Sequence, residues 1–196
     1  MGHTYADPRE IAAELLKEAA GKRDIAMYVA DPHVALASAP QQLFLDPSDT
    51  FRLDLPLQHK PKPTKDLRVR RLATREDAER VNELYLQRDM VPTDPDYLWS
   101  QRESRKLISL VAEDQVTGEI VGTVTGVDHV ELFNDPSGGS SLWCLTVDPQ
   151  ASRPGVGEQL MAGLADYFYR IGCKHLDLSV LHDNVQAKAL YEKLGF

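Results

Sequence analysis

The apolar and polar positions of this chain repeat at strand and helix spacings from Leu67 onward. Leu67–Leu72 alternates apolar residues with arginines, as a half-exposed strand does. Thr74 and Asp77 then form a capping-box pattern at the start of an amphipathic helix. We expect the following elements after it: a short helix from Asp94-Pro95, strands at Leu107–Ala112, Glu119–Val127 and Ser141–Val147, a helix at Val156–Ile171, a strand at Lys174–Leu181 and a helix at Val185–Leu194. The order of elements is β-α-α-β-β-β-α-β-α. It predicts a protein of the α/β class, whose sheet is mixed, of the α+β type, and carries helices on its faces.

The first third of the chain has a weaker pattern. Asp7-Pro8 is typical of a helix start, and Ile25–Ala30 is typical of a short strand. We expect residues 1–55 to form a small α/β appendage. Residues 56–66 are rich in proline and lysine with little to bury, which predicts an extended linker. Residues 67–196 then form the main domain.

Composition and charge exclude several classes of partner. A formal net charge of −8 argues against binding to nucleic acid or to an anionic membrane, so a site for a phosphorylated ligand has to be local. Cys144 and Cys173 lie in apolar runs without the spacing of a metal site, so we expect free thiols and no metal. No apolar run approaches the ~20 residues of a membrane span, and residues 1–10 lack the apolar core of a signal peptide. We therefore expect a cytoplasmic protein.

The stretch Ser141–Gly157, SLWCLTVDPQASRPGVG, carries the first candidate chemistry. An apolar strand pattern ends at Asp148-Pro149, and a polar loop leads to Gly155 and Gly157 at the start of a helix. Glycines let the backbone approach a ligand closely, and the first N–H groups of a helix have no intrahelical partner. This order of elements predicts a cradle for the pyrophosphate of a nucleotide-like molecule.

Two familiar nucleotide loops fit this stretch poorly. A P-loop requires a lysine directly after its last glycine, and none follows Gly157. A dinucleotide-binding loop requires a third Gly or Ala, where this chain has Leu160. Asp177 lies about twenty residues further on, as a ribose-binding acid would, but it falls inside a strand pattern.

Two motifs resemble those of the GNAT N-acetyltransferases. Residues 152–157, SRPGVG, are similar to the family's Arg/Gln-x-x-Gly-x-Gly/Ala loop, whose amides bind the pyrophosphate of CoA. Asn184, Ala187 and Tyr191, followed by EKLGF, match a second signature of the family. The resemblance covers about two thirds of the chain, and it implies acetyl-CoA as co-substrate, no metal, and a small-molecule amine as acceptor.

The resemblance also implies a set of cofactor contacts. They would come from the strand backbone and the glycine loop: Leu145, Thr146, Val147, Ser152, Arg153, Pro154, Gly155, Val156, Gly157 and Asn184. Ser152 departs from the family, which usually has Arg or Gln there. Either Arg153 beside it or the loop amides would then supply the phosphate contact. Asn184 is also suited to capping the last helix, and the two roles are compatible.

The family's chemistry implies direct transfer within a ternary complex. Tyr191 is then the candidate general acid that protonates the leaving thiolate, although a tyrosine at this spacing also serves helix packing. The general base is not identified: Asp128, His129, Glu131 and Asp177 are candidates, and a water chain is an alternative. Cys144 is a poor nucleophile because the sequence places no activating histidine beside it.

A closer resemblance is to the acetyltransferase portion of the N-acetylglutaminylglutamine synthetases. It rests on five stretches: YVADPHVALA, LFLDPSDTFRL, VPTDPDYLWS, GTVTGVDHV and SLWCLTVDPQASRPGVGE. It implies glutamine or glutaminylglutamine as acceptor, a role in osmolyte biosynthesis, and a fused or associated ATP-grasp ligase as partner. In the family the sheet continues past the residue that matches Phe196. We therefore expect a fragment with an uncovered sheet edge and a tendency to form a homodimer.

Two other functions fit the same residues. The chain could be a non-catalytic acyl-CoA-binding module that regulates or docks onto a larger ligase. It could also be a structural interaction domain with a vestigial glycine loop, which Ser152 weakly favours.

Overall fold

The computed structural model describes residues 6–19, 27, 29, 31–57, 61–151 and 153–196. The chain divides into two units, Met1–Pro47 and Ser48–Phe196. In the first unit, α1 (Pro8–Leu15) starts as expected, because the Asp7 carboxylate accepts a hydrogen bond of 2.9 Å from the Arg9 N–H. This unit also contains α2 (Pro32–Ser38). The strand expected at Ile25–Ala30 falls mainly on residues outside those described.

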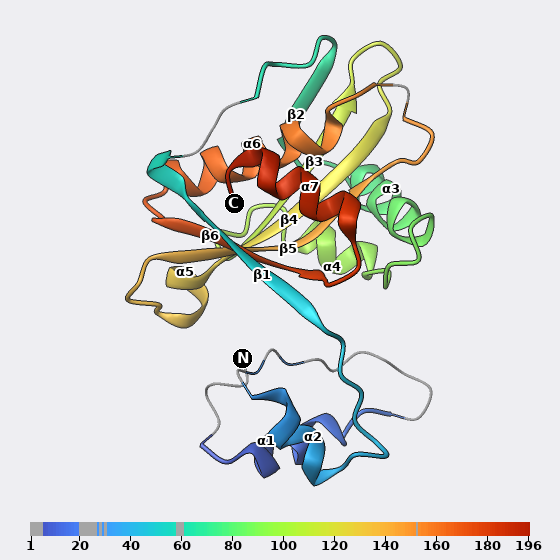
Figure 1. Ribbon diagram of the computed structural model, residues 1–196. Helices are drawn as coiled ribbons and strands as arrows, with labels where there is room; N and C mark the ends of the chain where they lie inside the picture. Colours follow the sequence, from blue (N-terminus) through green and yellow to red (C-terminus); the bar gives the residue numbers. More distant parts are fainter. Residues whose placement is uncertain (1–5, 20–26, 28, 30, 58–60, 152) are drawn as a thin grey trace. The chain divides into compact units, whose positions relative to one another are not determined.

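The second unit is built on a six-stranded mixed sheet with the order β1-β6-β5-β4-β3-β2 (Figure 1). The strands are β1 (Ser48–Asp54), β2 (Leu67–Arg71), β3 (Leu107–Asp114), β4 (Ile120–Asp128), β5 (Gly139–Val147) and β6 (His175–Leu181). Neighbouring strands are antiparallel except β5 and β6, which are parallel. The mixed sheet and α/β class predicted from the periodicity are confirmed.

Strand β1 lies on the sheet although we expected its residues in the appendage. It pairs along the outer edge of β6, from Ser48 opposite Leu181 to Asp54 opposite His175. A short 3₁₀ helix (Leu55–Leu57) follows it, and Leu55 is fully buried in the core. The outer edge of β6 is therefore paired within this chain, and the two units divide after residue 47.

Helices cover both faces of the sheet. On one face, α3 (Arg75–Leu86) and α4 (Pro95–Ser100) bury a core that contains Val81, Leu84 and Tyr85. The predicted capping box is present at the start of α3, with reciprocal bonds between Thr74 and Asp77. On the other face, α6 (Val156–Arg170) and α7 (Val185–Leu194) pack on the larger core. A further short helix, α5 (His129–Phe133), lies between β4 and β5. Figure 1 shows α6 and α7 crossing the same face of the sheet.

Glycines on β4 let α6 approach the sheet closely. A Cβ on Gly126 would lie only 2.6 Å from a ring carbon of Phe168, and one on Gly122 would lie 2.9 Å from Val156. Such distances are too short for any side chain, so glycine at these positions fixes the depth at which α6 packs. The start of α6 is thereby held beside the end of β5.

Strands β5 and β6 separate part of the way along their length. Their pairing runs only from Gly139 opposite His175 to Ser141 opposite Asp177, whereas β5 continues to Val147. A β-bulge accompanies the separation, because Thr125 and Gly126 of β4 pair with Cys144 and Leu142 and leave Trp143 without an opposite residue. Bulges bend a strand and increase its twist. The bulge therefore accounts for β5 leaving β6 at this point.

None of the helices in the described part of the chain is long and apolar enough to cross a membrane.

Candidate active site

Among the described residues, no strand pairs with the β6 side of β5 beyond Ser141. We call this stretch, Leu142–Val147, the open edge of β5. The Asp148 N–H bonds to the Val121 carbonyl of β4, at 2.9 Å. Hydrogen-bonded pairs alternate along an antiparallel ladder, so Leu145 and Val147 turn their N–H and C=O groups away from β4, toward the β6 side. The open edge thus presents backbone donors and acceptors to a ligand.

The side chains of the open edge divide between the two faces of the sheet. Leu145 and Val147 pack against the core beneath α6, whereas Cys144 packs against the core beneath α3. The Thr146 hydroxyl is buried and has no hydrogen-bond partner among the described residues. Arg88, at the end of α3, donates from Nε to the carbonyl of Val147 at 3.0 Å. The carbonyl at the end of the open edge is therefore within reach of a side-chain donor.

The glycine loop ends in a left-handed residue that starts α6. Gly155 has φ of 82°, a conformation that favours glycine, and it caps α6 without a side-chain acceptor. The first helical bond runs from the Gln159 N–H to the Gly155 carbonyl, at 3.0 Å. The amides of Val156, Gly157 and Glu158 precede that bond and have no intrahelical acceptor. The start of α6 therefore has three backbone N–H groups without an intrahelical acceptor.

Ion pairs fix the ends of this loop. At its start, Asp148 accepts a bond of 2.5 Å from Arg80 of α3 and one of 2.8 Å from the Gln150 N–H. Nearer its end, Arg153 makes a bidentate pair with the buried Asp114 of β3, at 2.6 and 3.1 Å. These bonds keep the pKa of Asp114 at about 2, mainly through the Arg153 guanidinium. Arg153, one of the two candidates for the phosphate contact, is thus bound to a carboxylate and shapes the loop.

The segment 61–65, expected to belong to an extended linker, packs on the glycine loop. The Lys62 carbonyl accepts a bond of 2.8 Å from the side chain of Gln159. The Lys65 carbonyl lies 3.4 Å from Nη1 of Arg153. A Cβ on Gly155 would lie 3.1 Å from the Thr64 hydroxyl. This segment therefore forms one wall of the candidate site.

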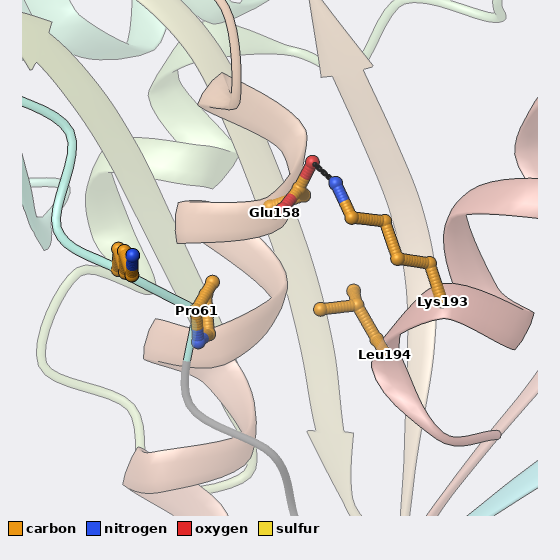
Figure 2. Close-up of a pocket in the computed structure, with 5 residues that line it drawn as sticks. Pro61, Glu158, Lys193 and Leu194 are labelled. Carbon is orange, nitrogen blue, oxygen red and sulfur yellow. Dashed lines mark hydrogen bonds and ion pairs between the residues drawn. The ribbon is translucent and has the colours of Figure 1, made fainter.

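A pocket of about 350 Å³ lies beside the first turns of α6 (Figure 2). It is lined by Pro61, Lys62, Glu158, Lys193 and Leu194. The Glu158 carboxylate, which would repel an anion at this helix end, accepts a bond of 2.6 Å from Lys193. Figure 2 shows this pair reaching across from α6 to α7 above Leu194. Because Lys193 is paired with Glu158, Lys62 leaves the pocket with a net positive charge in a chain that is acidic overall.

Helix α7 brings the second motif beside the glycine loop. Asn184 caps this helix as expected, accepting from the Ala187 N–H at 3.1 Å. A Cβ on Gly157 would lie 3.4 Å from Leu190 of α7 and 3.8 Å from Val147 of β5, so these three elements meet at one place. Tyr191, which follows Leu190 on α7, has only 5% of its surface exposed. Its ring centroid lies 6.2 Å from that of Phe51 and 5.8 Å from that of Phe196, and burial raises the pKa of its phenol.

The remaining predicted residues occupy distinct positions. Pro154 is exposed on the loop, the side chain of Val156 is buried in the core, and Ser152 lies outside the described residues. Asp128 caps α5 with bonds to two amides, and Asp177 is paired with Arg52 of β1 through two bonds of 2.7 Å. Both carboxylates therefore have structural partners.

Three further features bear on the chemistry. His129 lies 2.7 Å from the Ser141 hydroxyl. Burial raises the pKa of the Cys144 thiol, which makes it a weaker nucleophile at neutral pH. Within the described ranges, no group of three His, Cys, Asp or Glu side chains is placed to hold a metal ion.

Sequence reasoning missed the residues that support the site. Arg80, Arg88 and Asp114 hold the strand end and the loop, but each is on an element distant in the chain. Asp114 lies two residues beyond the expected strand Leu107–Ala112, and its partner Arg153 is 39 residues away in the chain.

Comparison with known proteins agrees with this geometry. The model of the acetyltransferase (GNAT) family matches residues 69–196. The ribosomal-protein-S18-alanine N-acetyltransferase from Escherichia coli is 22% identical, with a TM-score of 0.52 over 66% of this chain and 76% of that one. A GCN5-related N-acetyltransferase from Sphaerobacter thermophilus is 22% identical, with a TM-score of 0.59 over 85% of this chain and 53% of that one. AAC(6')-Iy, solved with the bisubstrate analog CoA-S-monomethyl-acetylneamine, is 20% identical, with a TM-score of 0.54 over 66% of this chain and 90% of that one.

The solved structures share the fold at low identity, and the family model spans well over half of the chain. The chain therefore belongs to the acetyltransferase (GNAT) family of acyltransferase enzymes.

Proposed function

We propose that this chain moves the acetyl group of acetyl-CoA to the amino group of a small acceptor, by direct transfer in a ternary complex. The observation that carries the proposal is the junction of the open edge of β5 with the free amides of Val156, Gly157 and Glu158. One ligand with an anionic end and an extended amide-containing arm would satisfy both features. The pyrophosphate and pantetheine of CoA are such a pair of groups.

The residues around this junction suit the binding of acetyl-CoA. The amides at the start of α6 would bind the pyrophosphate, aided by the positive end of the helix dipole. Leu145 and Val147 would bond the pantetheine amides as a neighbouring strand does. The neutralisation of Glu158 by Lys193 removes a repulsion that would oppose a phosphate there. Arg153 would order the glycine loop through its ion pair with Asp114. Asn184 would order the start of α7 by capping it.

The chemical step then needs three contributions from the chain. A backbone N–H on the open edge of β5 would stabilise the charge that develops on the thioester oxygen. Tyr191 would protonate the leaving thiolate, and the burial that raises the pKa of its phenol keeps it protonated at neutral pH. The third contribution is a base for the acceptor ammonium.

Glutamine and glutaminylglutamine are the acceptors we propose first. The support is the resemblance of residues 28–37, 43–53 and 141–158, among others, to the acetyltransferase portion of the N-acetylglutaminylglutamine synthetases. The same resemblance leads us to propose a fused or associated ATP-grasp ligase as partner and osmolyte biosynthesis as the setting. We also propose a cytoplasmic location.

Thiol release from acetyl-CoA tests the proposed function. The 196-residue chain is incubated with acetyl-CoA and a panel of amines: glutamine, glutaminylglutamine, glutamate, lysine and an aminoglycoside. We expect release above the rate without acceptor for at least one amine, with the acetylated amine identified by mass spectrometry. Binding of acetyl-CoA without turnover of any amine would instead favour the non-catalytic acyl-CoA-binding module.

A further inference from the structure

A cluster of polar side chains lies where β5 separates from β6. Ser141 is the last residue of β5 that pairs with β6. Its hydroxyl lies 2.7 Å from Nε2 of His129 on α5 and accepts a bond of 3.0 Å from the indole N–H of Trp143. Trp143 is the bulge residue and is 60% exposed. The bond between Ser141 and His129 also joins α5 to β5, and the His129 ring lies 5.6 Å from that of Phe133.

Glycine at position 139 allows this cluster to form. A Cβ there would lie 2.6 Å from Oδ2 of Asp135 and 3.1 Å from Nδ1 of His129. The Asp135 carboxylate is held by the Ser137 hydroxyl and by the amides of Ser137 and Gly139, which keep its pKa at about 2. Nδ1 of His129 therefore faces a permanently ionised carboxylate, 4.0 Å away.

The hydrogen bonds define a direction for proton transfer. An indole N–H can only donate, so it occupies one lone pair of the Ser141 oxygen. The single proton of Ser141 can then be donated to Nε2 of His129. This bond requires the neutral imidazole to carry its own proton on Nδ1, the nitrogen that faces Asp135. Ser141, His129 and Asp135 are thus arranged in the order hydroxyl, imidazole, carboxylate, in which an imidazole serves as a base.

The position of the cluster fits the end of an acetyl-CoA arm. Strand β5 runs from Ser141 toward the glycine loop. An arm that starts at the loop and follows the open edge in the opposite direction passes Val147, then Leu145, and reaches Trp143 last. Two residues of a strand span about 6.6 Å, so Ser141 lies one such step beyond Trp143.

We propose that Ser141 and His129 form the proton relay that deprotonates the acceptor amine. This inference rests on the proposed acetyl transfer. The acceptor ammonium gives a proton to Ser141 Oγ as the Ser141 proton passes to Nε2 of His129. The nitrogen lone pair attacks the thioester carbon, and the C–S bond breaks. The thiolate leaves with the bonding electrons and takes a proton from Tyr191. The attacking nitrogen loses its second proton to solvent as the amide forms. His129 then releases its proton to solvent, and Tyr191 recovers one from solvent.

The electrostatic surroundings of His129 suit a base. Burial is the main cause that lowers the pKa of its imidazole, so the base form prevails at neutral pH. Asp135 and Asp177 oppose this effect and would stabilise the imidazolium, whereas His175 adds to it. The charged and titratable groups around His129 come from α5 and its flanks, from β6 and from β1 beyond it: Asp128, Glu131, Asp135, His175, Asp177 and Arg52.

Kinetics of His129→Gln test the relay, because Gln fills similar space but cannot take the proton. With the best acceptor from the panel, we expect kcat/KM to fall about 10²- to 10⁴-fold. The affinity for acetyl-CoA should stay unchanged. In the unsubstituted chain, kcat/KM should fall as the pH drops through the pKa of His129, and this acid limb should be absent in His129→Gln. Ser141→Ala should lower kcat/KM by a smaller factor, since a water molecule can replace the hydroxyl. His33→Gln, on the exposed surface of α2, is the matched control and should change nothing.

A second measurement does not depend on the acceptor. Nitrogen chemical shifts of ¹⁵N-histidine-labelled protein report the tautomer of neutral His129. We expect the proton on Nδ1; a proton on Nε2 would overturn the relay, because Nε2 would then donate to Ser141. Unchanged kcat/KM and pH profile in His129→Gln would also overturn it, while leaving acetyl transfer intact. Failure of the unsubstituted chain to acetylate any amine would instead overturn the proposed function, and the relay with it.

Discussion

Replacement of Tyr191 by phenylalanine should lower kcat by about 10²- to 10⁴-fold, the usual contribution of a general acid. The phenol is buried, and its raised pKa keeps its proton available for the leaving thiolate. Phenylalanine keeps the ring contacts with Phe51 and Phe196, so the packing of α7 should be preserved. Steady-state thiol release measures kcat, and calorimetry should show the same affinity for acetyl-CoA.

Tyr169→Phe is the matched control for this prediction. Tyr169 lies on α6 with 49% of its surface exposed, so loss of its hydroxyl should leave kcat unchanged. Equal activity of Tyr191→Phe and the unsubstituted chain would show that Tyr191 serves only the packing of α7. That result would remove the proposed general acid and strengthen the case for a docking module.

Gly155→Val should weaken binding of acetyl-CoA by about 10- to 100-fold. Gly155 has φ of 82°, and a β-branched residue held there costs about 1–3 kcal/mol. A Cβ would also press on the Thr64 hydroxyl, 3.1 Å away. The loop should therefore leave the conformation in which the amides of Val156 and Gly157 converge. Titration calorimetry with acetyl-CoA measures the change in Kd.

Gly118→Val separates backbone strain from loss of the cradle. Gly118 has φ of 77° in the turn between β3 and β4, with nothing within 4 Å of a Cβ. Both variants should lose thermal stability, but Gly118→Val should bind acetyl-CoA with unchanged affinity. An unchanged Kd in Gly155→Val would contradict the assignment of the cradle.

Local signals in the sequence predicted most of the second unit. The capping box of Thr74 and Asp77, the cap at Asn184 and the glycine-led start of α6 depend on neighbouring residues, and all three are present. These features are readable because their hydrogen bonds join residues close together in the chain. The same locality made the loop and the second motif recognisable as similar to those of the GNAT family.

Features that depend on distant residues were not predicted. Strand β1 joins the sheet through partners such as Arg52 and Asp177, which are 125 residues apart. Helix α5 has only one full turn, too short to show a helical period. The ion pair between Arg153 and Asp114 likewise depends on a tertiary contact. The sequence showed which residues could bind a phosphate, but not which of them already had a partner.

Hydrogen–deuterium exchange with and without acetyl-CoA tests the central claim most directly. Binding along the open edge of β5 and at the start of α6 should slow exchange of the amides of Leu145, Val147, Gly157 and Glu158. Exchange in α4, which packs on the opposite face of the sheet from α6 and α7, should not change. Slower exchange confined to other parts of the chain, or no change at these four amides at saturating acetyl-CoA, would contradict the account.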